Sequence, residues 1–287
     1  MSAPRSAPKY LLLVLGRRLQ ELRRAKGFSA QDVGDELRLA QSTVTRMEQA
    51  KIALKWPAVK AMLELYGVEQ AEVREFRALT DEANEPGWWQ SYQDALPKWF
   101  AVHVSLEDAA SQIRGYEIHV VPGLLQTEDY ARAVLRLNRP HPTADELKRR
   151  VDLRMERQGL LTRPDPPQLW IILDELMLRR PAGEPELMKA QVDRLIEAMD
   201  LPNVTLQVLA FSAGLHPGAF GPFTHFRLPM EDFPDVVCTD TLTGATYSED
   251  RDEVAQHRAV LDRMSAQAMS KARTRKFLED IRKELDQ

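Results

Sequence analysis

The sequence of 287 residues contains a single cysteine and no long apolar run, and both shortages limit what the protein can be. Cys238 cannot form a disulfide within the chain, and a lone cysteine excludes a zinc site built from several cysteines. The early apolar segment at 10–15 is too short to cross a bilayer and lacks a small-residue cleavage site. We therefore expect a protein of the reducing cytoplasm that has no membrane partner.

Aromatic residues are also scarce, at 7% of the chain, yet several gather directly after a turn-forming segment at 84–87. The cluster consists of Trp88, Trp89, Tyr92, Trp99 and Phe100. Such rings can stack on single-stranded bases, but the neighbouring Gln90, Asp94 and Glu107 offer no basic groove. We favour a role in sealing a domain junction or a dimer contact.

Charge is distributed unevenly along the chain, although the net charge is only -4. Residues 1–60 contain twelve Lys and Arg against five Asp and Glu, a net charge of +7 that leaves -11 for the remainder. A basic head on an acidic body is typical of a phosphate-binding module joined to an unrelated domain. The alternative is a solvated basic helix surface.

One stretch has the spacing of a helix-turn-helix. Apolar periodicity predicts short helices at 29–37 and 41–49, joined by residues 38–40. In the second helix Val44 and Met47 share one face, so the helical period of about 3.6 residues turns a polar set outward. That set is Gln41, Ser42, Thr45 and Arg46. Each can hydrogen-bond a base edge, so we predict that they read double-stranded DNA in its major groove.

Residues on either side of this second helix are suited to hold the sugar-phosphate backbone. The predicted backbone contacts are Arg17, Arg18, Ser29, Lys51 and Lys55. Their side chains offer ammonium, guanidinium or hydroxyl donors, which are the usual partners of phosphate oxygens. We expect these contacts to contribute affinity without sequence preference.

The segments Gly27-Phe28-Ser29 and Arg46-Met47-Glu48-Gln49-Ala50-Lys51 resemble the Cro/repressor-type (Xre) helix-turn-helix family, and the resemblance covers about residues 15–68. It implies an all-α bundle of five helices, lambda-repressor-like, with 41–49 as the recognition helix. It also implies that Arg23 pairs with Glu48 as a brace between helices, in preference to contacting DNA.

Three residues depart from the pattern of that family. Ala30 stands where a phosphate-contacting glutamine is usual, and Arg38 and Ala50 stand where glycine is usual. We expect Arg38 and Ala50 to need a positive φ, at a cost of about 1 kcal/mol each.

Composition and periodicity divide the chain into five segments. They are a disordered N-terminus at 1–10, the helix-turn-helix DNA-binding domain at 11–83, a linker at 84–87, an α+β domain at 88–268 and a charged helix at 269–287. Within the α+β domain, apolar alternation predicts strands at 169–173, 204–211, 223–228 and 235–240. Longer amphipathic stretches predict helices at 144–161, 185–199 and 251–268.

The α+β domain carries Val121-Pro122-Gly123-Leu124-Leu125-Gln126-Thr127, preceded by Leu106-Glu107-Asp108 and followed by Ile172-Leu173-Asp174-Glu175. In this order the segments resemble the C-terminal domain of a large actinobacterial group of Cro/repressor-like regulators described as antitoxin-like. The resemblance implies a transcriptional regulator that is often associated with a small partner protein.

Residues with catalytic chemistry are present but scattered, so we expect no enzyme, no catalytic residues, no metal and no cofactor. His119, His216 and His225 have no paired spacing, and the glycine-rich loop at 214–221 is more typical of a connection than of an anion site. Asp174 and Glu175 end an apolar strand, which fits a functional site and a helix cap equally well. Cys238 has no evident activating neighbour.

The function predicted from these observations is sequence-specific DNA binding by a homodimeric transcriptional regulator. One alternative is an antitoxin-like protein whose C-terminal domain binds a small partner protein, with DNA binding serving autoregulation. Another is a regulator whose C-terminal domain senses a small-molecule effector, which would fit its aromatic cluster and long loops.

Overall fold

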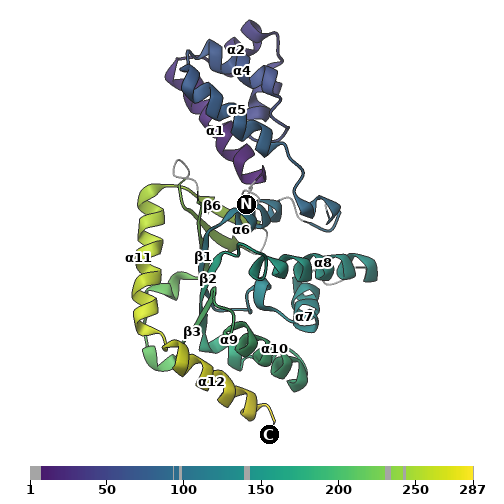
Figure 1. The fold of residues 1–287 in the computed structure, drawn as a ribbon, viewed down its shortest axis with the longest axis vertical. Coiled ribbons are helices and arrows are strands. Elements are labelled where there is room, and N and C mark those ends of the chain that lie inside the picture. The colour runs from purple at the N-terminus through teal and green to yellow at the C-terminus, as the bar shows by residue number, and fades with distance from the viewer. Residues whose placement is uncertain are drawn as a thin grey trace. The chain divides into compact units, whose positions relative to one another are not determined.

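The computed structural model describes residues 8–92, 94–96, 99–138, 143–229, 234–241 and 244–286. It divides into two compact units, the first ending at Ser91 and the second beginning at Tyr92, shortly after the linker predicted at 84–87. The first unit is helical, and the second combines a mixed sheet with helices (Figure 1). Within the described residues, we find no helix that is both long and apolar enough to cross a membrane.

The first unit is built from α1 (Pro8–Ala25), α2 (Ala30–Leu37), α3 (Gln41–Glu48), α4 (Trp56–Leu65) and α5 (Gln70–Ala83), after which the 3-10 helix η1 (Trp88–Tyr92) follows. Helix α1 contacts both α3 and α5, and its Leu11 and Leu19 are fully buried. Helix α1 begins at Pro8, so residues 8–10 do not belong to the disordered segment predicted at 1–10. The reason is that Tyr10 is buried and anchors this turn; residues 1–7 lie outside the described residues.

The sheet of the second unit has the strand order β3-β2-β1-β4-β5-β6. Its strands are β1 (Gln112–Glu117), β2 (Gln168–Asp174), β3 (Val204–Leu209), β4 (Phe223–Arg227), β5 (Val236–Thr241) and β6 (Gly244–Ser248). Strands β1, β2 and β3 pair in parallel, whereas β4 pairs antiparallel with β1 and β5, and β5 pairs antiparallel with β6.

The predicted strands correspond to β2, β3, β4 and β5, whereas β1 and β6 were not predicted. Strand β1 carries Arg114 and Gly115 in place of an apolar alternation. It nevertheless lies between β2 and β4 in the sheet, and its Arg114 pairs with Asp262 at 2.7 Å and stacks over the Trp170 ring at 4.6 Å. Because these partners come from distant segments of the chain, the residues of β1 show no local pattern that predicts a strand.

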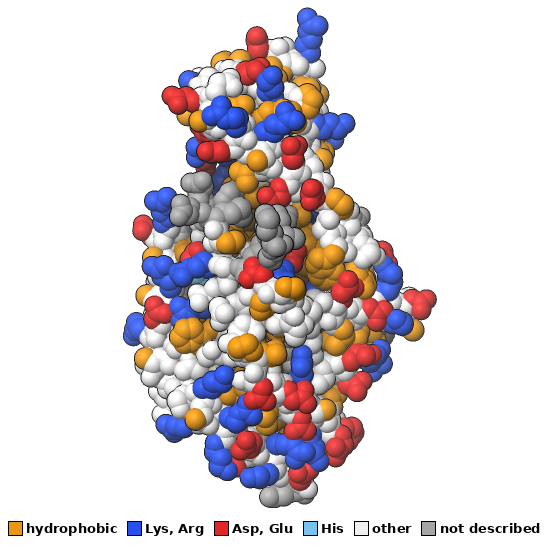
Figure 2. Space-filling view, in the orientation of Figure 1, with side chains coloured by type: hydrophobic (Ala, Val, Ile, Leu, Met, Phe, Trp, Pro, Cys, Tyr) orange, Lys and Arg blue, Asp and Glu red, His pale blue; other side chains and the backbone are white. Residues whose placement is uncertain are grey.

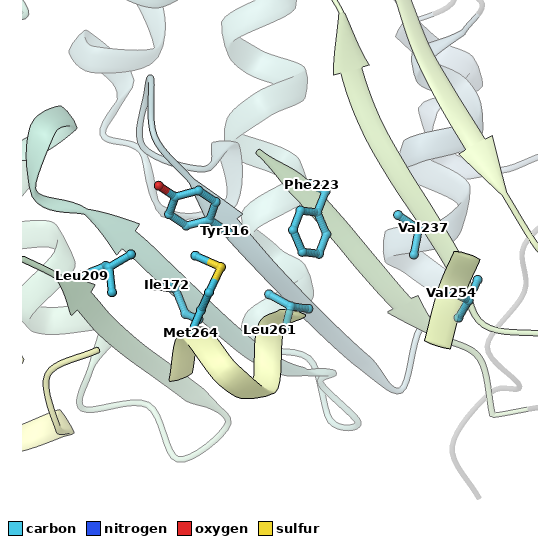
Figure 3. Close-up of a cluster of buried hydrophobic side chains, with 8 residues drawn as sticks. All are labelled: Tyr116, Ile172, Leu209, Phe223, Val237, Val254, Leu261 and Met264. Atoms are coloured by element: carbon cyan, nitrogen blue, oxygen red, sulfur yellow. The ribbon is translucent and has the colours of Figure 1, made fainter. Parts of the chain in front are cut away.

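Helices cover both faces of the sheet. They are α6 (Phe100–Ala109), α7 (Glu128–Asn138), α8 (Ala144–Arg157), α9 (Glu175–Arg179), α10 (Pro185–Ala198), α11 (Arg251–Gln267) and α12 (Lys271–Glu284). Helix α11 packs Leu261 and Met264 against Tyr116 and Phe223 to form one core (Figure 3). Helix α6 lies on the opposite face, where the ring of its His103 meets that of Phe226 in β4.

The segment at 269–287 was predicted as a charged helix after the α+β domain, with apolar residues spaced for a partner or for the body of the protein, and in the structure α12 lies on the body. Helix α12 packs against α10 and β3, with Thr274 and Leu278 fully buried. The Thr274 hydroxyl accepts a hydrogen bond from the Val208 amide at 3.1 Å. Charged residues dominate its composition, but one apolar stripe suffices to hold the helix on the body of the unit.

Candidate nucleic-acid interface

The turn between α2 and α3 is closed on one carbonyl. The amides of Arg38 and Leu39 both donate to the Gly34 oxygen, the latter at 2.8 Å. Gly34 permits this close approach, because a Cβ there would lie 2.7 Å from the Leu39 carbonyl oxygen. The predicted positive φ values are confirmed at 55° for Arg38 and 53° for Ala50.

A buried ion pair ties α1 to the end of α3. Arg23 Nε donates to Glu48 Oε1 at 2.6 Å and Arg23 Nη2 donates to Glu48 Oε2 at 2.9 Å. Arg23 also donates to the Phe28 carbonyl at 2.8 Å, and the Glu48 hydrogen bonds raise the pKa of Arg23. The structure thus places both residues between helices, with Arg23 8% and Glu48 6% exposed.

The two helices pack closely where this pair lies. A Cβ on Gly16 of α1 would lie 2.6 Å from the Glu48 carbonyl oxygen, so only glycine fits without a shift of the helices. Sequence reasoning missed the packing roles of Gly16 and Gly34, because a glycine inside a helical pattern gives no sign of which backbone approaches it.

Ser29 caps α2, and the hydrogen bonds of this cap determine which donor of its side chain remains free to contact DNA. Its hydroxyl accepts a hydrogen bond from the Asp32 amide at 3.1 Å, and its own amide donates to Asp32 Oδ2 at 2.7 Å. These bonds to Ser29 lower the pKa of Asp32. The hydroxyl hydrogen remains able to donate to a phosphate oxygen. The Ser-x-x-Asp spacing was readable in the sequence as this reciprocal cap.

Helix α3 buries its apolar residues and presents its polar ones. Val44 and Met47 are 0% and 2% exposed, whereas Gln41, Ser42 and Arg46 are exposed and Thr45 is half-buried. Arg46 Nε donates to the Ser42 carbonyl at 3.1 Å, and the Thr45 hydroxyl donates to the Gln41 carbonyl at 3.1 Å. Both side chains therefore lie along the outer surface of their own helix.

Cationic side chains lie around this surface. Arg17 and Arg18 of α1, together with Lys51 and Lys55 after α3, are all exposed. Arg18 Nη2 pairs with Glu72 Oε1 of α5 at 2.7 Å. Figure 2 shows Lys and Arg side chains on the visible face of the first unit, with acidic side chains between them.

The start of α3 also favours negative charge. Ala40 precedes the helix, and no side chain in the described part of the unit caps it. The first amides of a helix carry a partial positive charge and attract anions when they are left uncapped.

In the second unit, the side chains at the end of β2 have structural partners. Asp174 caps α9 by accepting from the Leu176 amide at 2.8 Å, and it accepts the Tyr116 hydroxyl at 2.8 Å. Glu175 accepts from the Phe211 amide at 2.9 Å. The helix-cap interpretation of Asp174 is therefore confirmed.

The scattered histidines do not converge on one site. His119 is exposed, while His216 Nε2 lies 4.0 Å from Asp174 Oδ2 and His225 Nε2 lies 3.0 Å from Asp235 Oδ2. The loop at 214–221 rests on the core, because a Cβ on its Gly218 would lie 2.5 Å from the methyl carbon of Met264.

Sequence reasoning missed one cluster in the second unit. His103, Cys238 and Asp240 bring one ligand atom each to within 4.8 Å of one another. The sequence carries no spacing signal for this cluster, because His103 and Cys238 are 135 residues apart. It also supplies the polar neighbour for Cys238 that sequence reasoning did not identify.

Two family models match the chain. A model described as a helix-turn-helix domain matches residues 14–76, and a model described as a domain of unknown function (DUF5753) matches residues 100–280. No curated protein matches the chain, and no solved structure matches it. The first unit is therefore a helix-turn-helix domain, which supports DNA as its partner and a role in transcription regulation.

Proposed function

Because the chain belongs to the DUF5753 family and carries a helix-turn-helix domain ahead of that region, we propose that it is a sequence-specific, DNA-binding transcriptional regulator of the Cro/repressor type. In this proposal α3 enters the major groove, α2 braces it across the backbone, and the second unit is regulatory.

The outer surface of α3 carries the proposal. A helix that buries Val44 and Met47 while exposing an amide, hydroxyls and a guanidinium has the donors and acceptors that base edges require. Gln41 suits the N6 and N7 atoms of adenine, and Arg46 suits the O6 and N7 atoms of guanine. Ser42 and Thr45 can bond either type of base edge.

Arg46 loses little free energy when it leaves its contact with the Ser42 carbonyl to bind a base. Its hydrogen bond to the Ser42 carbonyl is exposed to solvent, and such a bond contributes only about 1 kcal/mol. A bidentate contact to guanine discriminates against the wrong base by about 1 to 3 kcal/mol.

Phosphate contacts by Arg17, Arg18, Ser29, Lys51 and Lys55 would hold α3 in register. Arg18 must leave Glu72 to reach a phosphate, and the side chains of this pair are 54% and 32% exposed. An exposed pair of this kind contributes at most about 1 kcal/mol, so its loss is small beside the release of counterions from DNA.

We further propose that two copies bind a pseudo-palindrome, with half-sites about 34 Å or a multiple of that distance apart. Selection of bound duplexes from a random library by the purified full chain tests specificity, symmetry and spacing together. Enrichment of two inverted half-sites at a fixed spacing is expected. Recovery of no common sequence would refute base reading by α3.

A second role, binding of a small partner protein by the second unit, is supported by exposed apolar side chains on the segment that connects β3 to β4. Phe211, Leu215 and Phe220 are 56%, 96% and 101% exposed. The three residues lie within ten positions of one another in the sequence. Large apolar side chains left exposed can mark an interaction site. In this proposal the chain is antitoxin-like, and its DNA binding serves autoregulation.

Co-purification from the native host tests this second role when the wild type is compared with a variant. Phe211→Ser, Leu215→Ser and Phe220→Ser combined should lose a stoichiometric protein that the wild type retains, while operator binding is unchanged. Leu137→Ser, at a residue that is 82% exposed on α7, is the matched control. Equal retention of the partner by the triple variant would exclude this surface.

A further inference from the structure

Three side chains from two elements meet on the sheet face that α6 covers. Cys238 and Asp240 lie two residues apart on β5, so strand alternation points both toward the same face. His103 of α6 reaches them because its ring packs against Phe226 of the neighbouring strand β4. Cys238 is buried, His103 is nearly so, and Asp240 is exposed, so the group has a solvent-facing side.

All three ligand atoms lie within 4.8 Å of one another, and two of their three spacings are close to those around a tetrahedral ion. His103 Nδ1 lies 3.8 Å from Cys238 Sγ, and Cys238 Sγ lies 3.6 Å from Asp240 Oδ1. With zinc-sulfur bonds of about 2.3 Å and zinc-nitrogen or zinc-oxygen bonds of about 2.0 to 2.2 Å, tetrahedral ligand atoms stand about 3.6 Å apart.

His103 is also oriented as a metal ligand would be. Its Nε2 lies 3.2 Å from Glu107 Oε1, and Glu107 is held in turn by two hydrogen bonds from Arg157 at 2.9 and 2.7 Å. A carboxylate that accepts the Nε2 proton leaves the Nδ1 lone pair directed at Cys238. Metal-bound histidines commonly have this second partner.

We propose that His103 Nδ1, the Cys238 thiolate and the Asp240 carboxylate bind a divalent transition-metal ion of the zinc class, with a fourth position for water. Thiolate and imidazole select zinc over magnesium or calcium, which prefer oxygen ligands alone. Binding releases the Cys238 thiol proton to solvent, so affinity rises with pH.

Titration of the full chain with Co²⁺ tests the proposal, after purification under reducing conditions and removal of metal with a chelator. One equivalent should bind, with the visible ligand-field bands of tetrahedral cobalt and a thiolate-to-cobalt charge-transfer band in the near ultraviolet. Zn²⁺ should remove both signals by displacement. The measurement uses no DNA, so its outcome is independent of the proposed DNA-binding function.

Two variants separate a built site from chance binding. Asp240→Asn changes an exposed side chain and should weaken Co²⁺ binding about tenfold or more. Cys238→Ser should abolish the charge-transfer band, with folding checked by circular dichroism. His257→Gln on α11 is the matched control and should bind as the wild type does. Absence of stoichiometric binding, or wild-type binding by both Asp240→Asn and Cys238→Ser, would overturn the proposal.

Discussion

Ala50 follows α3 with a φ of 53°, a conformation in which its methyl group crowds the backbone. Arg38 shares this conformation at the joint of the helix-turn-helix. Both strained residues flank the proposed recognition helix, so its two ends are held by the surrounding packing in a backbone conformation that L-residues rarely adopt.

Ala50→Gly should stabilise the first unit by about 0.5 to 1 kcal/mol, because glycine adopts positive φ without the Cβ penalty. Urea unfolding followed by circular dichroism measures the change. Ala53→Gly is the matched control: Ala53 is exposed and outside the positive-φ region, so glycine there should give no gain. Equal effects of the two substitutions would show that Ala50 carries no strain.

Arg23→Met should destabilise the first unit by about 3 to 5 kcal/mol, because it leaves the Glu48 carboxylate buried without its cation. Adding Glu48→Leu to this variant should recover most of the loss, since an apolar pair requires no compensating charge. A double-mutant cycle from unfolding curves gives the coupling free energy. A coupling near zero would contradict the brace.

At the scale of elements, α3 separates two kinds of proposed DNA contact. Arg46 lies on the exposed surface of the last turn of α3, and Lys51 follows the end of this helix. Base contacts specify sequence, whereas phosphate contacts add affinity to every duplex. Substitution of the two residues should therefore have different signatures.

Arg46→Ala should cost about 1 to 3 kcal/mol on the selected operator and relax its sequence preference, while Lys51→Ala should weaken all duplexes alike and reduce the salt slope by about one. Fluorescence anisotropy at several salt concentrations measures both effects. Lys276→Ala on α12 is the control for simple loss of a surface cation. Loss of affinity by Arg46→Ala that is equal on operator and random duplex would remove its base-reading role.

The segment at 122–127 is held by polar side chains of α8 and α10. Gln191 of α10 accepts from the Thr127 amide at 2.8 Å and donates to the Leu125 carbonyl at 2.8 Å. Gln126 is itself buried and accepts from Arg154 Nη1 at 2.7 Å. The glutamine of the motif therefore has a packing role, which its residue type alone did not reveal.

Gln191→Met should destabilise the second unit by about 2 kcal/mol, because it leaves a half-buried amide and a buried carbonyl without the partner that Gln191 provides. Thermal and urea unfolding measure the loss. Gln267→Met at the exposed end of α11 is the matched control and should change stability by less than about 0.5 kcal/mol. Similar values for the two variants would contradict the role of Gln191.

At the scale of the whole molecule, the geometry of the proposed homodimer sets the spacing between the two half-sites on DNA. Each half-site occupies one face of the duplex, and the helical repeat of DNA is about 10 to 10.5 base pairs. The basic charge is concentrated in residues 1–60, so both copies would present the same end to DNA.

Insertion of about five base pairs between the half-sites should weaken binding by at least tenfold, because it turns one half-site to the opposite side of the duplex. Insertion of about ten base pairs should weaken binding less, because it restores the facing. Electrophoretic mobility shifts on the two operators compare them with the parent. Equal affinity for all three spacings would indicate that each copy binds alone.

Local patterns in the sequence determined the helix-turn-helix, the outward residues of its second helix, the two strained positions and strands β2 to β5. Each of these depends on periodicity within one element or on the chemistry of one turn. Only the tertiary structure decided that β1 is central, that α12 belongs to the body, and that His103 lies beside Cys238, 135 residues away. Contacts between distant segments depend on strand order and helix packing, and neither leaves a repeat in the sequence by which it could be read.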